Sequence, residues 1–251
     1  MIGTSNREAN DMNDNIFQRH EVKYLVSDWQ RRMLEQAMRD RMVPDSHGES
    51  TVCNVYYDTP DFRLIRTSLE KPVYKEKLRI RSYGPAEERQ PIFVEMKKKY
   101  KGIVYKRRIS MEQRSAVAFL AGDIPLPEDS QIGHELEYFL RFYGELAPAV
   151  HLSYDRAAFF SREDPNLRVT FDRNILWRTT DLSLEAQPGG EPILESGQSL
   201  MEIKTAAAIP LWLVELLDNG GIRQTSFSKY GQAYCAMLQT HFEETGGVFC
   251  A

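Results

Sequence analysis

Charged and apolar side chains alternate along several short segments of this chain, and this alternation limits its fold more than any other sequence feature. In "LRIRS" (78–82), Leu78 and Ile80 point to one face of an extended strand, and Arg79 and Arg81 point to the other. The same design recurs in "RHEVKYL", "FVEMKKK", "RVTFD" and "MEIK". The pattern predicts an antiparallel sheet whose strands each have one apolar and one charged face.

The remaining secondary structure follows from β-branched and aromatic runs, helical spacing and cap signals. Strands are predicted at residues 16–26, 50–59, 73–83, 90–100, 103–111, 149–161, 167–175 and 199–205. Helices are predicted at residues 27–42, 114–122, 132–144, 210–221 and 228–244. Cap signals are Ser27 with Gln30 and Ser110 with Gln113, and Trp29, Trp177 and Trp212 are interpreted as core residues.

These elements predict an α+β fold: a closed antiparallel β-barrel of about eight strands that forms a charged tunnel and is flanked by helices. The chain contains no repeat of fixed period and no long linker, so we expect one domain at residues 16–245. Residues 1–15 have the composition of a disordered leader, and residues 246–251 are interpreted as a tail.

The alternation alone leaves two arrangements of the strands open. In the more common one, apolar faces fill the interior and charged faces meet water. In the other, apolar faces lie outward beneath the helices and the charges line a water-filled bore. At least five amphipathic helices need an apolar surface to cover, which favours the second arrangement. Like charges in such a bore repel one another, so we expect its ligand to be a chain of phosphates.

The distribution of charge supports a local anion site. Between Lys75 and Arg108 there are twelve Lys or Arg and four Glu, a local charge of +8, although the whole chain carries −4. That total and a pI of about 5.8 do not indicate a nucleic-acid binder. Three scattered cysteines fit a reducing compartment. With no apolar run of membrane-spanning length, we expect a cytoplasmic protein, held at the inner face of a membrane only through a partner chain.

The residue types on the charged faces suit phosphate and a divalent metal. Arginine binds phosphate oxygens bidentately, and lysine supplies a mobile point charge. Carboxylates occupy a minority of the positions, at Glu21, Glu95 and Glu202. Carboxylate and phosphate oxygens together suit Mn²⁺ or Mg²⁺, so these three residues are candidate metal ligands. No Walker motif and no glycine-rich dinucleotide motif is present.

Nine short motifs together resemble a known family. In chain order they are "RHEVKY", "VYYDTPDF", "LRIRSYG", "VEMKKKY", "YKRRISM", "SYDRAAF", "RVTFD", "LMEIKT" and "SFSKYG". They resemble the VTC domain, the catalytic domain of the vacuolar transporter chaperone polyphosphate polymerases, within the triphosphate tunnel metalloenzyme (CYTH-like) superfamily. The resemblance runs from about Phe17 to Met237. Each motif alone is weakly specific, whereas nine in order are strongly specific.

The resemblance implies a phosphotransferase that moves the γ-phosphate of ATP onto a growing polyphosphate chain with a divalent metal. The residues implied as both catalytic and substrate-binding are Lys23, Arg79, Arg81, Lys97, Arg156, Arg168 and Lys229. Ser228, Lys106 and Arg108 are implied for substrate binding, although "YKRR" does not fix which of its residues faces inward. Glu202 is implied as a metal ligand. Family members also bind inositol phosphates on a basic surface. The candidate residues for such a surface here are Lys98, Lys99, Lys101 and Arg107. The alternative interpretation is that these four residues are ordinary solvated charges on a tight hairpin.

Two other functions stay open at this point. One is a triphosphatase or nucleotide cyclase on the same barrel, and the other is a non-catalytic module that holds polyphosphate or inositol phosphates. Hydrolytic members of the superfamily carry Glu-x-Glu-x-Lys on the first strand, and here the matching positions are Arg19, Glu21 and Lys23. Loss of the first carboxylate weakens a two-metal site that would activate water, which favours transfer to phosphate.

Overall fold

The computed structural model describes residues 20–46, 48–101, 103–126 and 129–244. Its strands are β1 (His20–Ser27), β2 (Met42–Pro44), β3 (Ser50–Asp58), β4 (Tyr74–Tyr83), β5 (Pro91–Tyr100), β6 (Ile103–Glu112), β7 (Ala147–Ser161), β8 (Arg168–Arg178), β9 (Glu191–Pro192), β10 (Gln198–Thr205) and β11 (Gln224–Thr225). Its helices are α2 (Asp28–Met38), α3 (Arg63–Leu69), α4 (Gln113–Ala121), α5 (Gln131–Tyr143), α6 (Leu211–Asn219) and α7 (Lys229–Glu244). The predicted leader (1–15) and tail (246–251) lie outside the described residues.

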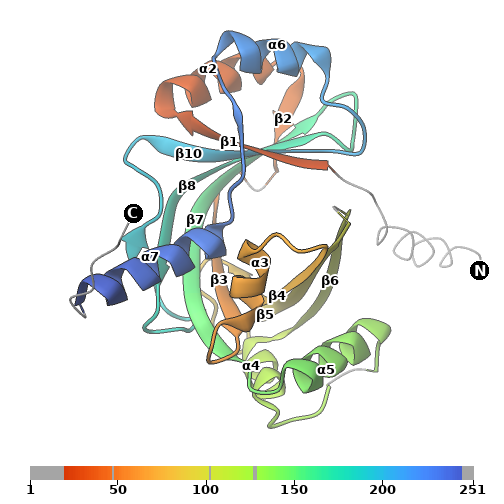
Figure 1. Ribbon diagram of the computed structural model, residues 1–251. Helices are drawn as coiled ribbons and strands as arrows, with labels where there is room; N and C mark the ends of the chain where they lie inside the picture. Colours follow the sequence, from red (N-terminus) through yellow and green to blue (C-terminus); the bar gives the residue numbers. More distant parts are fainter. Residues whose placement is uncertain (1–19, 47, 102, 127–128, 245–251) are drawn as a thin grey trace, which may run out of the picture.

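All the strands belong to one antiparallel sheet. Its order is β11-β1-β10-β8-β7-β3-β4-β5-β6, with β2 added beside β7 and β9 beside β8. Figure 1 shows a strongly bent sheet with an upper arm (β1, β10 and β8) and a lower arm (β4, β5 and β6), joined by the long strand β7 and its neighbour β3. The bend turns one face of both arms toward a shared space.

The prediction of a closed barrel is wrong. In the described part of the chain, β6 pairs only with β5, and no backbone ladder joins it to β1 or β11. The arms instead meet through side chains, since Lys97 Nζ of β5 lies 3.6 Å from Glu21 Oε2 of β1. Two-residue β11 covers only a short part of the β1 edge.

The apolar faces of the strands point outward beneath helices, as predicted. On the lower arm, Leu78, Ile80, Val94 and Met96 pack with residues of α4 and α5. On the upper arm, the corresponding apolar residues pack in the same way with residues of α2 and α6. They are Val169, Phe171, Met201 and Ile203. Figure 1 shows α2 and α6 above the upper arm and α4 and α5 below the lower arm. The charged stripes of both arms therefore turn inward.

A third core, which the sequence did not predict, fills one end of the concave face. Tyr56, Ile65, Leu152 and Tyr230 are among its buried members, and they come from β3, α3, β7 and α7. Figure 1 shows α3 and α7 between the two arms. At this end, buried apolar and aromatic side chains therefore take the place of the charged ones.

Asp58 joins the two helices of this third core. Its carboxylate accepts backbone N–H bonds from Leu64 at 2.8 Å and Ile65 at 3.0 Å, which caps the start of α3. It also accepts a 2.9 Å bond from the Tyr230 hydroxyl of α7. No helix was predicted between the strands at residues 50–59 and 73–83, so α3 is a difference from the prediction.

Several local predictions differ from the structure. The capping box of Ser27 and Gln30 is confirmed, but its helix ends at Met38, and residues 42–44 form β2 instead. The cap at Ser110 is wrong, because Glu112 precedes α4 and makes no side-chain cap bond. Trp29 is 63% exposed and is not a core residue, whereas Trp177 is buried. Among the described helices, none is both long and apolar enough to cross a membrane.

Candidate functional site

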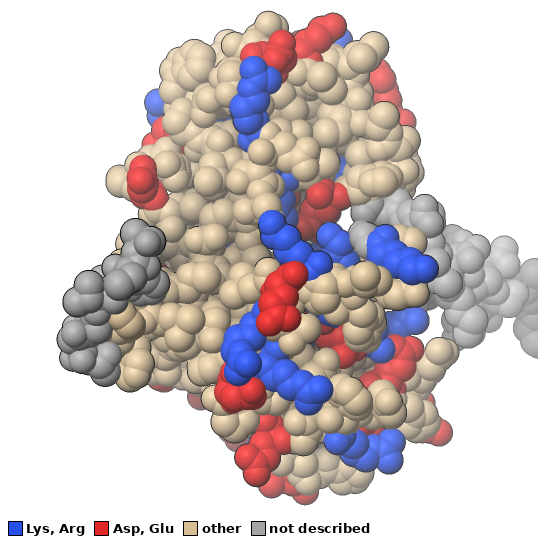
Figure 2. All heavy atoms as spheres, in the orientation of Figure 1, with Lys and Arg blue, Asp and Glu red and all other residues tan. Residues whose placement is uncertain are grey.

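The inward-facing stripes of both arms bring basic side chains into one channel. Lys23 and Lys204 come from the upper arm, Arg79 and Lys97 from the lower arm, and Lys229 from the start of α7. Figure 2 shows Lys and Arg side chains with a few carboxylates along the hollow between the arms, on the face in view. The channel carries more basic groups than carboxylates, which makes it a receptor for anions.

On β1 and β10, two lysines lie between two carboxylates. Lys23 Nζ lies 3.3 Å from Glu21 and 3.4 Å from Glu202, and Lys204 Nζ lies 3.8 Å and 3.5 Å from the same carboxylates. The register pairs Glu21 with Lys204 and Lys23 with Glu202, so all four share one face. Burial alone would raise the pKa of Glu21, but Lys97, Lys204 and Lys23 lower it to about 2.

A second cluster lies where β7, β8 and the start of α7 meet. Arg156 donates two bonds to the Asp172 carboxylate, at 2.6 Å and 2.7 Å. Lys229 Nζ donates to the same carboxylate at 2.5 Å and to Glu202 at 3.5 Å. Burial opposes ionisation of Glu202, yet Lys229, Lys204 and Lys23 hold its pKa well below the ordinary value. Glu202 thus connects the two clusters as a fully ionised carboxylate.

A third cluster surrounds Glu95 on the lower arm. Arg79 donates to Glu95 Oε2 from Nη2 at 2.6 Å and from Nε at 2.9 Å. Lys106 Nζ lies 2.5 Å from Glu95 Oε1, and Arg108 and Arg81 lie 3.8 Å and 3.9 Å from this carboxylate. Burial would raise the pKa of Glu95, but Arg79, Arg81 and Lys106 lower it. Lys106 and Arg108 therefore both face inward, which the sequence had left open.

The three candidate metal ligands do not form one site. Glu21 and Glu202 share the same two lysine neighbours on adjacent strands, whereas Glu95 lies in the separate cluster of the lower arm. No group of three His, Cys, Asp or Glu side chains in the described part of the chain is placed to hold a metal by itself. Mg²⁺ commonly takes one or two carboxylates and completes its shell with substrate phosphates and water. Glu202 and Glu21 fit a site of that kind, and Glu95 does not belong to it.

The other predicted residues lie at the edges of the channel or outside it. Arg168 is partly exposed, lies 3.7 Å from Asp45 and has the same strand parity as Asp172. Ser228 lies at the start of α7, next to Lys229. On the outer face, Lys98 and Arg107 pair with Glu135 of α5 at 3.3 Å and 3.2 Å, so these two candidate inositol-phosphate residues lie apart from the channel, whereas Lys99 has the strand parity of Lys97.

Four channel residues were not assigned to the site from sequence. Lys77 and Lys204 have the strand parity of Arg79 and Glu202, so the alternation carried the signal that would have found them. Asp172 was seen on a charged face but was given no role. Tyr154 gave no signal in sequence; burial would raise its pKa, but Arg81, Arg156 and Lys229 lower it to about 8.

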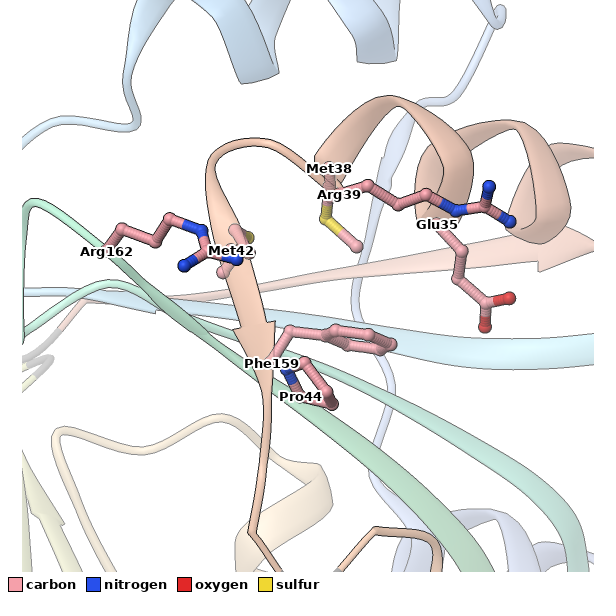
Figure 3. Close-up of a pocket in the computed structure, with 7 residues that line it drawn as sticks. All are labelled: Glu35, Met38, Arg39, Met42, Pro44, Phe159 and Arg162. Atoms are coloured by element: carbon pink, nitrogen blue, oxygen red, sulfur yellow. The ribbon is translucent and has the colours of Figure 1, made fainter.

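A separate hollow of about 320 Å³ lies between α2, β2 and β7. Figure 3 shows Met38, Met42 and Phe159 in it, with Arg39 and Arg162 on opposite sides. Its lining shares no residue with the three charged clusters. The candidate chemistry therefore belongs to the channel and not to this hollow.

Comparison with known proteins identifies the family. The VTC domain family matches residues 18–238, which is most of the chain. The chain belongs to the VTC domain family. This match confirms the resemblance that was inferred from the nine sequence motifs.

Curated relatives of this VTC domain are subunits of a larger assembly. It is 23% identical over 225 residues to vacuolar transporter chaperone complex subunit 4 of Schizosaccharomyces pombe, covering 72% of this chain and 31% of that protein. The same subunit of Trypanosoma brucei brucei is 24% identical over 237 residues, covering 79% of this chain and 30% of that protein. The chain thus spans about a third of the length of these relatives.

Solved structures share the fold at low sequence identity. A putative adenylate cyclase of Bacillus halodurans aligns with a TM-score of 0.54 and 16% identity, covering 85% of this chain and 94% of that one. A putative adenylyl cyclase of Hippeastrum, described as having a dominant triphosphatase activity, aligns with a TM-score of 0.51 and 16% identity, covering 91% and 96%. At this identity the likeness concerns the fold alone.

Proposed function

We propose that this VTC domain is a polyphosphate polymerase that transfers the γ-phosphate of ATP onto a growing chain of inorganic phosphate. The observation that carries the proposal is the convergence of basic side chains from both arms and α7 on one channel with few carboxylates. A linear polyanion bears charge on every unit and matches such a channel along its length. Membership of the VTC domain family supports the same substrate class.

The channel has two tasks in this reaction: it positions the phosphate groups and it neutralises their negative charge. Phosphoryl transfer passes through a loose transition state in which the protein has little covalent work to do. Arg79 and Arg81 of β4 supply planar forks for phosphate oxygens, and Lys23 and Lys229 supply point charges from the opposite side. Incoming phosphates replace part of the carboxylate contacts that these cations make in the free protein. The remaining proposed substrate contacts are Lys97, Lys106, Arg108, Arg156, Arg168 and Ser228.

The acceptor needs no general base. A terminal phosphate is already an anionic nucleophile at neutral pH. We propose that Glu202, with Glu21 beside it, would hold Mn²⁺ or Mg²⁺, which would neutralise charge on the transferred phosphoryl group. Glu21 is the single carboxylate on the inward face of β1 in the described part of the chain, which favours transfer to phosphate over activation of water.

The likeness to a cyclase described as a triphosphatase makes hydrolysis the competing function to test. The test incubates the protein with ATP and Mn²⁺, with and without a short polyphosphate primer, and separates the products on a gel. The proposal expects phosphate chains that lengthen with time, and faster with primer. Orthophosphate alone would mean a triphosphatase, cyclic nucleotide would mean a cyclase, and unchanged ATP with polyphosphate bound would mean a binding module.

A further inference from the structure

Lys77 is a basic residue of the channel that differs from its neighbours in its partners. Its Nζ donates a 2.8 Å bond to Ser228 Oγ, which comes from the turn into α7. The same Ser228 oxygen accepts a 3.1 Å bond from the backbone N–H of Gly231. Lys77 Nζ also lies 5.9 Å from the centre of the Tyr230 ring. The lysine is therefore held at the α7 end of the channel by groups without negative charge.

Ten other basic groups of the channel each have a carboxylate within 4 Å. They are Lys23, Arg79, Arg81, Lys97, Lys106, Arg108, Arg156, Arg168, Lys204 and Lys229. Lys77 makes no such ion pair with the described residues. A partly buried ammonium without a counter-ion is costly, and an anion that reached it would remove that cost.

The groups that face Lys77 are cations from three strands. They are Lys75 and Arg79 on β4, Lys97 on β5 and Lys23 on β1. Burial and these like charges lower the pKa of Lys77 to about 7. On the α7 side, burial and Asp58 raise the pKa of Tyr230, so that its hydroxyl stays neutral. Lys77 is consequently only partly charged near neutral pH in the free protein.

We propose that Lys77 Nζ and Ser228 Oγ form an anion subsite for one phosphate group of the substrate chain, and that Lys77 takes up a proton from solvent when the phosphate binds. The subsite rests on the proposed substrate class but not on turnover. A phosphate oxygen in contact with Lys77 favours the ammonium form, which then donates to both the phosphate and Ser228. The subsite would couple occupancy of the channel end to pH.

The test measures tripolyphosphate binding by calorimetry without metal, at pH 8, in two buffers of different ionisation enthalpy. Wild-type protein should take up more protons per bound ligand than Lys77→Arg, because arginine is charged before binding. Lys77→Arg should keep most of the affinity, and Lys77→Met should lose about tenfold or more. Arg114→Met, which removes an exposed cation at the start of α4, outside the channel, is the control and should behave as wild type.

Equal proton uptake by wild type and Lys77→Arg would overturn the coupling, and unchanged affinity in a folded Lys77→Met protein would overturn the subsite. If Lys77→Met does not fold, the difference in proton uptake between wild type and Lys77→Arg still tests the proposal. These measurements need no catalysis. An expected result here together with no polymer from ATP would keep the subsite and reject the polymerase.

Discussion

Lys97 Nζ of β5 lies 3.6 Å from Glu21 Oε2 of β1, although five other strands separate β1 from β5 in the order of the sheet. This contact joins the two arms where a closed barrel would have a backbone ladder. A double-mutant cycle with Lys97→Met and Glu21→Gln should therefore give a positive coupling in urea unfolding. Because the Lys97 side chain is 43% exposed, we expect a coupling of only about 0.5–1 kcal/mol. Additive effects of the two changes would contradict a contact between the arms.

The acid side of the stability profile should depend on Glu21. Its pKa is lowered to about 2 in the folded protein from an ordinary value of 4.5. A lowered carboxyl pKa adds stability above the unfolded value, and this stability is lost as the pH falls from about 4.5 toward 2. Glu21→Gln should therefore flatten the dependence of the unfolding free energy on pH in that window, by an amount of order 2 kcal/mol. Glu88→Gln, at an exposed pair with Arg114, should leave the slope unchanged.

Removing the Asp58 carboxylate should destabilise the protein and weaken phosphate binding together. Asp58→Ala deletes the cap of α3 and the acceptor for Tyr230, which should cost about 2–4 kcal/mol. Tyr230→Phe removes only the bond to α7 and should cost about 1 kcal/mol. Chemical unfolding measures the stability of both variants, and titration with tripolyphosphate measures binding. If Asp58→Ala bound as wild type while folded, α7 would not depend on this contact for its position.

Replacing Glu202 by Gln should separate turnover from anion binding. The change removes the carboxylate that we propose as a metal ligand and leaves Lys23, Lys204 and Lys229 with less counter-charge. Synthesis of polymer should fall by about 100-fold or more, while tripolyphosphate binding without metal should hold or tighten. Glu195→Gln, at an exposed loop residue, is the control for both measurements. Equal loss of turnover and of metal-free binding would place Glu202 in the structural framework instead.

The alternation of residues 78–82 was sufficient to predict which face of β4 is charged, because strand parity is a local property. The direction in which the apolar face of the sheet points, outward, followed from the number of helices that needed an apolar surface to cover. The packing of Leu78 and Ile80 with the helices α4 and α5 confirms that reasoning. The same parity applied to Lys77 would have added it to the site. These features could be predicted because they depend on periodicity alone.

Closure and the third core could not be predicted in this way. Whether β6 pairs with β1 depends on the width between the arms, and no property of either strand alone specifies it. The bond from Tyr230 to Asp58 joins residues 172 positions apart. The short helix α3 begins at Arg63 after Phe62, which has a positive φ of 57° and makes no cap bond with its own side chain. Its cap comes from Asp58, which precedes the usual cap position.

The most direct measurement is a crystal structure of the protein with tripolyphosphate bound. We expect the phosphates between the arms, in contact with Arg79 and Arg81 on one side and with Lys23 and Lys229 on the other. Phosphates bound instead on the outer surface of Lys98 and Arg107, with the channel empty of ligand, would contradict the assignment of the channel as the substrate site.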